Sequence, residues 1–429
     1  MNANQLLAAA VEVDITPPVG VWLEGYIERQ APSVGVHDPL QAQLLLLTRG
    51  EDQVLLISMD LIGVRLDFTE RVRLGIRQAI GVPEKNILLA CSHTHSGPTG
   101  FLADLPLIHT PVDPELQRMV ERKLVGAAME AQQRLRPAQI GVGHGHVRGI
   151  GTSRNDPEGG ALDDEVIVLR VDDGGRNPLA VWANYGCHPT VMGPENLLIT
   201  ADYPGAAREA LRRLYPDTIF LYTNGASGDV STRFTRREQT FAEVERMGRL
   251  LAGEVLKVMQ SIVVEETAVL GGSVEPVEFL FRPFPSEDQA RQEAERLQAE
   301  LEKLQSSGAS HGELRRAMTR AEGALARELL IRELHGMDRM RSQLQVLGIG
   351  PLALAGLPGE PFTRMVLDIK SRSGRPHLAV VSYCSDETGY FPDSQAFATG
   401  TYESLISPYR EDVAERICEQ VLKMLRVMG

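Results

Sequence analysis

The 429-residue chain is long enough to bury a large core in one or two domains. Its 43% apolar and 24% charged residues are ordinary for a folded enzyme and exclude a disordered chain. The formal charge of −13 argues against a nucleic-acid partner, because phosphate binding requires clustered Lys and Arg.

The amino-terminal residues Met1–Ala10 lack the basic start and the apolar region of a signal peptide. They lead into Val11–Ile15, which we expect to be the first strand. The longest apolar runs stay far below the roughly 20 residues that a transmembrane helix needs. Four cysteines in a chain of this length give no disulfide framework. We therefore predict a cytoplasmic protein with no transmembrane segment.

Residues 1–280 alternate between short strand-like runs and helical patterns. This alternation predicts an α/β fold with mixed β-sheet layers flanked by helices. The expected strands are Ala42–Leu47, Val54–Ser58, Ile87–Cys91, Val166–Val171, Leu179–Tyr185 and Ile219–Tyr222. The expected helices are Phe68–Ile80, Pro114–Arg136, Ala206–Leu214 and Glu243–Ser261.

Residues 285–340 differ in composition, because they are rich in Ala, Glu, Leu, Arg and Gln. Glu287–Gln305 and Glu313–Leu334, separated by Ser306–Ser310, predict an inserted hairpin of two antiparallel helices. The ordinary interpretation is a solvated hairpin that packs on the sheet edge or on a second subunit, as in a homo-oligomer. A lid over the active site is the alternative.

Strands are expected again after the hairpin, at Gln345–Ala355 and Leu378–Tyr383. A helix near Tyr409–Val427 ends the chain. The sequence contains no internal repeat. We predict a single domain over residues 1–429, with the hairpin inserted in it.

Two histidines, His93 and His95, follow the apolar strand Ile87–Cys91. If the chain stays extended there, both rings project from the same face, because side chains of a strand alternate with period two. That geometry suits a metal ion. Core or loop histidines remain the alternative, since His-x-His alone is weak evidence.

Other polar side chains also follow expected strands. His188 follows Val181–Tyr185, Glu360 follows Leu352–Ala355, and Asp60 follows Val54–Met59. In an open sheet, ligands bind beyond the carboxyl ends of the strands. Imidazole and carboxylate groups gathered there could hold Zn²⁺ and leave one position open for water. Each residue alone has an ordinary alternative; Glu360, for example, precedes Pro361 and could sit at a helix N-terminus.

Two other sets of residues compete with this interpretation. Gly225–Asp229 resembles a nucleophile elbow without its last glycine, so Ser227 or Ser231 could act as a covalent nucleophile. His144 and His146, in a Gly-rich strand-like segment, could be a second metal pair or ordinary surface histidines.

Five motifs occur in the order seen in the neutral/alkaline non-lysosomal ceramidase family, and the chain resembles the catalytic region of that family from about Val11 to Ser404, outside the hairpin. The motifs are Ser92-His-Thr-His-Ser-Gly-Pro98, Cys187-His-Pro-Thr190, Gly228-Asp-Val-Ser231, Pro358-Gly-Glu360 and Gly400-Thr-Tyr-Glu403. Carried over motif by motif, the resemblance implies one Zn²⁺ with four ligands: His93, His188, Glu360 and Tyr402.

The same resemblance places His95 beside the metal, Ser231 on the active-site serine and Arg154 near the substrate amide. Zinc lowers the pKa of a bound water toward neutrality, so water would attack a carbonyl carbon. His95 would transfer a proton to the leaving amine. Three carboxylates that could hydrogen bond to the metal-bound imidazoles and fix their orientation are Asp60, Asp202 and Asp229.

The expected function is therefore zinc-dependent hydrolysis of an N-acyl amide bond in a small-molecule or lipid substrate, as in the ceramidase family. A cytosolic zinc amidase, esterase or lactonase acting on a small non-lipid compound is a close alternative. A metal-independent serine hydrolase using Ser231 and a non-catalytic binding protein belong to different classes. Sensitivity to a chelator separates the metal enzyme from the serine hydrolase.

Overall fold

A computed structural model describes residues 5–102, 112–266 and 269–428. Eight strands form the larger sheet in the order β11-β9-β8-β6-β1-β3-β4-β5. Most neighbours are antiparallel, but β4/β5 and β9/β11 are parallel pairs. The strands are β1 (Leu6–Asp14), β3 (Gln41–Arg49), β4 (Asp52–Met59), β5 (Ile87–Cys91), β6 (Arg136–His146), β8 (Glu165–Asp173), β9 (Pro178–Tyr185) and β11 (Ile219–Asn224).

Four helices cover one face of this sheet: α1 (Leu66–Ile80), α2 (Pro114–Gln133), α3 (Asp202–Arg212) and α4 (Phe241–Ser261). Phe68 of α1 and Val120 of α2 pack on β1, β3 and β4. Val244 of α4 packs on β8 and β9 at the other end of the same face. Because both faces of the central strands are covered, β3 is an almost continuous apolar run instead of an alternating one.

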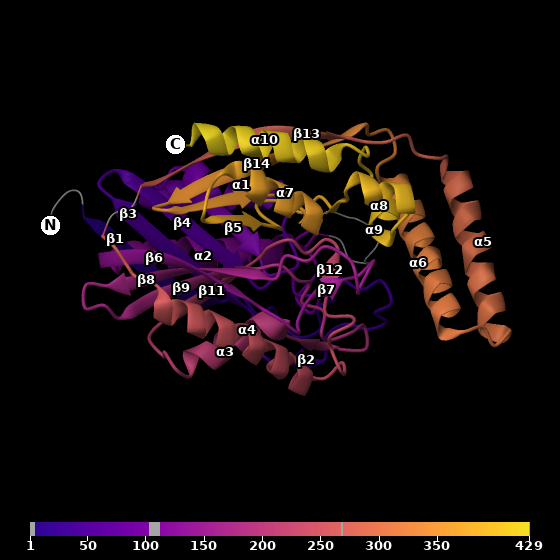
Figure 1. Cartoon of the computed structure of the whole chain (residues 1–429), viewed down its shortest axis with the longest axis horizontal. Coiled ribbons are helices and arrows are strands. Elements are labelled where there is room, and N and C mark those ends of the chain that lie inside the picture. Colours follow the sequence, from indigo (N-terminus) through magenta and orange to yellow (C-terminus); the bar gives the residue numbers. More distant parts are fainter. Residues whose placement is uncertain (1–4, 103–111, 267–268, 429) are drawn as a thin grey trace.

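The opposite face of the large sheet packs on a second sheet in the order β13-β14-β15-β17. Its strands are β13 (Leu270–Leu280), β14 (Arg339–Ile349), β15 (Leu352–Gly356) and β17 (Leu378–Val381). Trp182 of β9 and Leu354 of β15 belong to the core between the sheets. The outer face of the second sheet is covered by α7 (Thr363–Ser373) and α10 (Val413–Val427). The result is a four-layer αββα arrangement (Figure 1).

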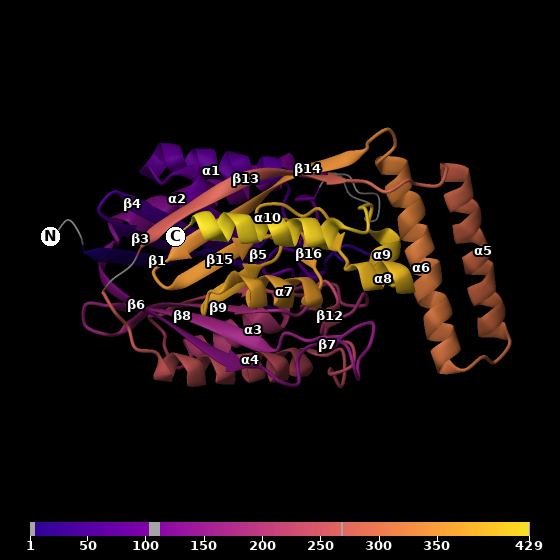
Figure 2. The same cartoon turned by 45° about the horizontal axis from the view of Figure 1, so that its top comes forward.

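The helical hairpin consists of α5 (Glu287–Ser306) and α6 (His311–Glu333) and projects from one end of the layers in both views (Figures 1 and 2). Each helix begins with a capping box, formed by Ser286 with Gln289 and by Ser310 with Glu313. α6 packs on α9 (Tyr402–Ile406) close to the body of the protein.

Shorter elements lie in the connections between these helices and strands. They are β2 (Gly35–Val36), η1 (Glu84–Asn86), β7 (Thr152–Ser153), β10 (Leu198–Ile199), β12 (Val230–Ser231), β16 (Glu360–Pro361), β18 (Tyr390–Phe391) and α8 (Ser394–Thr399). β12 pairs with β7, and β16 pairs with β18.

The predicted α/β class with mixed sheets and an inserted helical hairpin is confirmed. Two local predictions are wrong. Gln345–Ala355 is not one strand, because the chain turns at Gly350, where φ is +56°, and returns as the antiparallel strand β15. Pro361 does not begin a helix, since it lies in β16 and α7 begins at Thr363.

Several helix and strand boundaries also differ from the predicted ones. The first strand begins at Leu6, α2 ends at Gln133 where β6 soon follows, α3 begins at Asp202, and the last helix begins at Val413. The prediction of a single domain is untested and stays a prediction. Within residues 5–102, 112–266 and 269–428, no helix combines the length and the apolar character needed to span a bilayer.

Candidate functional site

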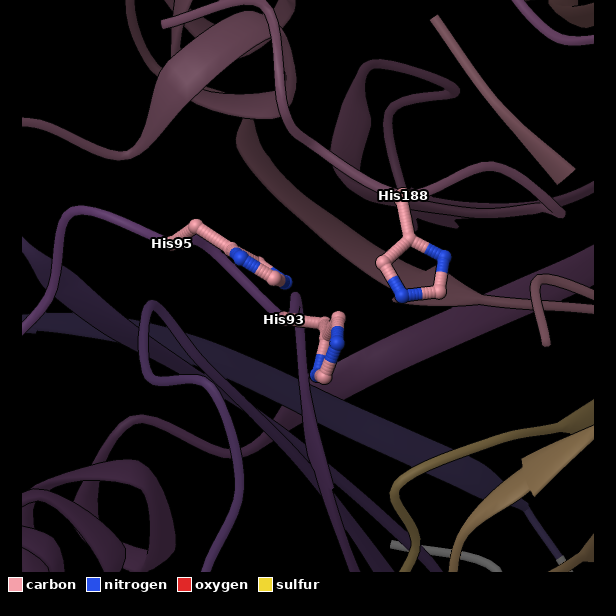
Figure 3. Close-up of side chains that lie close together, drawn as sticks. All are labelled: His93, His95 and His188. Atoms are coloured by element: carbon pink, nitrogen blue, oxygen red, sulfur yellow. The ribbon is translucent and has the colours of Figure 1, made fainter. Parts of the chain in front are cut away.

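The candidate site lies where three pairs of parallel strands end: β4/β5, β9/β11 and β15/β17. The carboxyl ends of parallel strands face one crevice, as expected from the sequence. His93 follows β5, His188 follows β9 and Glu360 follows β15. Figure 3 shows the rings of His93, His95 and His188 gathered around one point.

His93 is held in a strained but well-determined conformation. Its φ is +69°, in the left-handed region that non-glycine residues seldom adopt. Its backbone N–H donates to Leu61 O at 2.9 Å, and its Nδ1 donates to Ile62 O at 2.7 Å. The ring stacks on Tyr383 with centroids 3.7 Å apart. Because Nδ1 is occupied, Nε2 carries the free lone pair that a metal would need.

His188 is fixed in the same manner by backbone carbonyls. Its Nδ1 lies 2.7 Å from Ser227 O and 3.1 Å from Val230 O. Its Nε2 has no hydrogen-bond partner among the described residues and lies 3.0 Å from Oε2 of Glu360. Burial is the main cause that lowers the pKa of His188 well below its usual value. The ring is therefore neutral at physiological pH, the form in which an imidazole can bind a metal ion.

Glu360 completes the cluster from the second sheet. Its Oε2 lies 3.9 Å from Nε2 of His93. Burial raises the pKa of Glu360, although the neighbouring His93 and Arg154 oppose that shift. Tyr383 donates a hydrogen bond to Oε2 at 3.2 Å. The carboxylate, which follows β15, thus lies beside histidines that follow β5 and β9, although these strands are far apart in the sequence.

The donor set fits a tetrahedral metal ion. Bonds of 2.0–2.1 Å place two ligand atoms about 3.3 Å apart, and the two histidine-to-carboxylate distances of 3.0 and 3.9 Å bracket that value. The ring nitrogens of His93, His95 and His188 lie within 4.8 Å of one another. Buried nitrogens without partners are costly, so a ligand is expected to satisfy them.

His95 lies beside the proposed ligands, as the sequence suggested, but for a different reason. The chain does not stay extended through the His-Thr-His segment, because His93 adopts a positive φ. The rings of His93 and His95 are nevertheless 4.9 Å apart. Neither ring nitrogen of His95 has a partner among the described residues, and burial lowers its pKa well below the usual value. A β-carbon on Gly25 would lie 2.4 Å from Nδ1 of His95, so only glycine fits there.

Arg154 and Ser231 lie near the histidines. Arg154 directly follows β7, which pairs with β12, and Ser231 of β12 forms an isolated β-bridge with His188 through the backbone. Arg154 pairs with Glu403 at 3.0 Å and donates to Gly228 O. Its Nε is buried without a partner among the described residues. The guanidinium therefore has donor capacity left for a substrate oxygen.

The tyrosines form two groups. Tyr383 and Tyr390 both hydrogen bond to Glu360 and lower its pKa. Tyr390 also lies under the guanidinium of Arg154, 5.6 Å from its ring centroid. Tyr402 begins α9 and contacts α6 beside Gly323. Within the described chain, the structure gives Tyr402 no contact with His93, His188 or Glu360.

Tyr383 and Tyr390 were therefore missed from the sequence. The local signals were weak, since Tyr383 ends an apolar strand and Tyr390 follows a glycine. Tyr383 adopts φ +52°, another strained position beside the site. Its ring would not face His93 if the strand simply continued.

The three carboxylates that we expected to hydrogen bond to the imidazoles have other partners. Asp60 pairs with Arg208, Asp202 accepts backbone N–H bonds from Met192 and Tyr203, and Asp229 accepts from Thr363. That prediction is wrong for all three, because carbonyl oxygens already hold His93 and His188.

In the part of the chain that the structure describes, the competing serines and histidines do not form a second centre. Ser227 Oγ bonds to Tyr383 at 2.8 Å, and Ser231 Oγ accepts from Arg233 N at 3.3 Å. Among the described residues neither hydroxyl has a histidine as a base. His144 pairs with Glu165 and His377, whereas His146 pairs with Asp164 on the surface.

Comparisons with known proteins give a consistent result. Residues 7–220 match the model of the family "Neutral/alkaline non-lysosomal ceramidase, N-terminal". Neutral ceramidase 2 of Arabidopsis thaliana is 26% identical over 238 residues, covering 51% of this chain and 30% of that protein. The neutral ceramidase of Mycobacterium tuberculosis is 24% identical over 236 residues, covering 48% and 37%. The matched segment thus spans about a third of these relatives.

Two solved structures share the fold. A ceramidase complexed with C2 superposes with a TM-score of 0.77 at 15% identity, covering 99% of this chain and 75% of that one. The neutral ceramidase from Pseudomonas aeruginosa gives a TM-score of 0.75 at 16% identity, covering 99% and 74%. At this identity the likeness establishes the architecture alone.

Proposed function

Because this chain belongs to the neutral/alkaline non-lysosomal ceramidase family, we propose that it is a zinc-dependent hydrolase of N-acyl amide bonds. The observation that carries the proposal is the meeting of His93, His188 and Glu360 at metal-ligand spacing. They come from the ends of three different strands, and two of them have Nδ1 fixed by backbone carbonyls. Such fixation of the second nitrogen is typical of metal-binding histidines.

A bound Zn²⁺ supplies Lewis acidity and lowers the pKa of a coordinated water. The chain's own groups do the rest. The Nε–H group of Arg154 has no partner among the described residues, and it would donate to the carbonyl oxygen as negative charge develops. His95, kept neutral by burial, accepts a proton at a ring nitrogen and returns it to the leaving amine. Ser231, beside His188, orients the carbonyl group.

The zinc requirement is the direct test. Purified protein is expected to contain about one Zn²⁺ per chain by elemental analysis, and a chelator should remove both the metal and the hydrolysis of an N-acyl substrate. Added Zn²⁺ should restore activity, since the ligands are held by the fold and not by the ion. Activity that survives complete removal of the metal would instead favour the serine hydrolase.

A tyrosine completes the proposed ligand set, and the contacts support Tyr390 over Tyr402. Tyr390 hydrogen bonds to Glu360 and lies under Arg154, whereas Tyr402 packs against α6. The assignment of Tyr402 rested on the Gly-Thr-Tyr-Glu motif alone. Tyr402 is close enough to Arg154 for the guanidinium to act on its pKa, but it lies against α6.

Tyr390→Phe is expected to lower kcat about 10- to 100-fold, since a hydrogen bond to a charged group contributes about 1.5–3 kcal/mol. Tyr402→Phe is the matched control, and it should lower kcat by less than about fivefold. Zinc content of both variants is measured beside kcat. A larger loss in Tyr402→Phe would restore the original assignment.

A series of N-acyl substrates with different acyl chain lengths tests whether the substrate is a lipid or a small compound. A lipid amidase should gain kcat/KM as the acyl chain of the substrate lengthens, because each buried methylene contributes about 0.8 kcal/mol. An enzyme for a small amide, ester or lactone should show no such gain. The cytoplasmic location and the homo-oligomer through the hairpin stay predictions.

A further inference from the structure

Arg154, which we expect to donate to the substrate carbonyl, is held by a buried carboxylate. Its Nη2 lies 3.0 Å from Oε1 of Glu403, and the two side chains are 12% and 3% exposed. Oε2 of Glu403 also accepts from Nδ2 of Asn155 at 3.2 Å. Gly228 O and the ring of Tyr390 contact the guanidinium as well, but neither is a charged partner. The direction of Arg154 therefore depends on the position of Glu403.

Glu403 belongs to a helix that is too short to be stable by itself. α9 has 5 residues, Tyr402–Ile406, which make about one and a half turns. Isolated helices of this length do not form in water, so α9 keeps its place because of its neighbours. It packs chiefly on α6, and less on α8 and β18. In both views α9 lies between α6 and the body of the protein (Figures 1 and 2).

Two parts of the insertion between β13 and β14 hold α9. Arg282, in the segment that leads from β13 into α5, donates from Nη2 to Ser404 O and Leu405 O, both at 2.8 Å. These carbonyls lie near the C-terminus of α9, where a cation is favourable. On α6, an added β-carbon at Gly323 would lie 3.4 Å from Cδ2 of Tyr402 and 3.5 Å from Cδ1 of Leu405. Alanine fits this space, whereas a larger side chain would displace α9.

α6 is itself anchored to the second sheet. Leu330 of α6 and Leu334 at its C-terminus are buried in the core on the outer face of that sheet. Ala355 of β15 belongs to the same core, and β15 leads to Glu360. The contacts therefore run from the second sheet through α6 and α9 to Glu403.

We propose that the hairpin positions Arg154 through α9. Arg282 and α6 fix α9, and Glu403 of α9 fixes the guanidinium, so Glu403 is a positioning residue and the hairpin supports the candidate site. This inference rests on the proposed function, in which Arg154 stabilises the negative charge that develops on the carbonyl oxygen. Displacing α9 should therefore slow the reaction step more than it weakens the binding of the substrate.

Substitutions at Gly323 test the contact between α6 and α9 without touching the site. Gly323→Leu in the zinc enzyme should lower kcat for an N-acyl amide about 10- to 100-fold, because a small misplacement of a catalytic group has that effect. KM should stay within about threefold of wild type. Gly323→Ala should keep wild-type kcat. Gly253→Leu is the matched control, since Gly253 is a helical glycine of α4 with open space around it.

A second set of variants follows the path to the guanidinium. Glu403→Gln removes the charge and keeps the size of the side chain, and Arg282→Met removes the bonds to α9 without adding bulk. Both should lower kcat with unchanged zinc content. Arg296→Met, on the exposed face of α5, should not. Gly323→Leu combined with Glu403→Gln should lower kcat little more than the more damaging single change, because both act on one contact path. Losses that multiply would contradict a shared path.

Hydrogen exchange tests the same path independently of the reaction. The backbone N–H of Arg154 donates to Asp229 O at 2.7 Å. Gly323→Leu should speed exchange in residues 402–406 and also in residues 152–156, and Gly253→Leu should change neither. If the leucine variant does not fold, Arg282→Met gives the same comparison.

The two measurements separate this inference from the proposed reaction. If no amide is cleaved while the exchange at residues 152–156 responds to Gly323→Leu, the proposed hydrolysis fails and the support of Arg154 by the hairpin stands. If amides are cleaved and Gly323→Leu and Arg282→Met both keep wild-type kcat, the reaction stands and the inference is overturned. Exchange that rises in α9 and does not reach residues 152–156 would also overturn it.

Discussion

His188→Ala is expected to lose bound zinc and to reduce N-acyl hydrolysis by well over 100-fold. Loss of a residue that merely orients a ligand already costs about 10- to 100-fold, and His188 would bind the metal itself. Its Nε2 is the ring nitrogen that lies 3.0 Å from Oε2 of Glu360. Zinc content and kcat/KM are measured on the same preparation.

His335→Ala is the matched control, because the side chain of His335 is 78% exposed at the end of the hairpin. It should keep wild-type zinc content and activity. His188→Asn provides a second variant that can still bond to the carbonyls around Nδ1, in case the alanine variant is unstable. A folded His188→Asn protein with stoichiometric zinc would contradict the ligand assignment.

Asp60→Asn is expected to lower the free energy of unfolding by about 3–5 kcal/mol, the usual cost of breaking a buried ion pair from one side. Asp60 and Arg208 are 2% and 5% exposed and lie 2.6 Å apart. Among the described residues, the substitution leaves Glu12, at 3.8 Å, as the ion-pair partner of the buried Arg208 charge. Urea unfolding of the apo proteins measures the difference.

Asp67→Asn tests an exposed pair for comparison. Asp67 is 67% exposed beside Arg71, so its loss should cost less than about 1 kcal/mol. The double change Asp60→Leu with Arg208→Met should cost less than Asp60→Asn alone, since it removes both charges. Equal costs for Asp60→Asn and Asp67→Asn would show that the buried pair contributes no more than a surface one.

The sequence predicted the parts of the site that depend on strand ends. His93, His188 and Glu360 each follow a buried run, and the ends of parallel strands meet by the geometry of the sheet. The helical hairpin could also be predicted, because its composition and its serine caps are local signals. Local sequence patterns were sufficient to predict the features that follow from strand ends and helix caps.

The rest depended on contacts that no local pattern records. Asp60 could have faced an imidazole or a guanidinium, and only the fold brings Arg208 to it across 148 residues. Tyr383 and Ser385 both adopt positive φ, so the chain that carries Glu387 and Tyr390 leaves the strand in a direction that propensity does not predict. The turn at Gly350 was missed because apolar residues continue on both sides of it.

The ladder between β13 and β14 closes at the pair Leu280 and Arg339, so the whole arm from residue 281 to residue 338 leaves and rejoins the sheet at adjacent points. Chain ends that already lie together let an insertion be exchanged at small entropic cost. A short reverse turn in place of the arm would keep the register of β13 and β14. It would also uncover α9 and remove Phe281, Leu330 and Leu334 from the core of the second sheet, so only the part of the arm beyond these contacts is independent of the sheets.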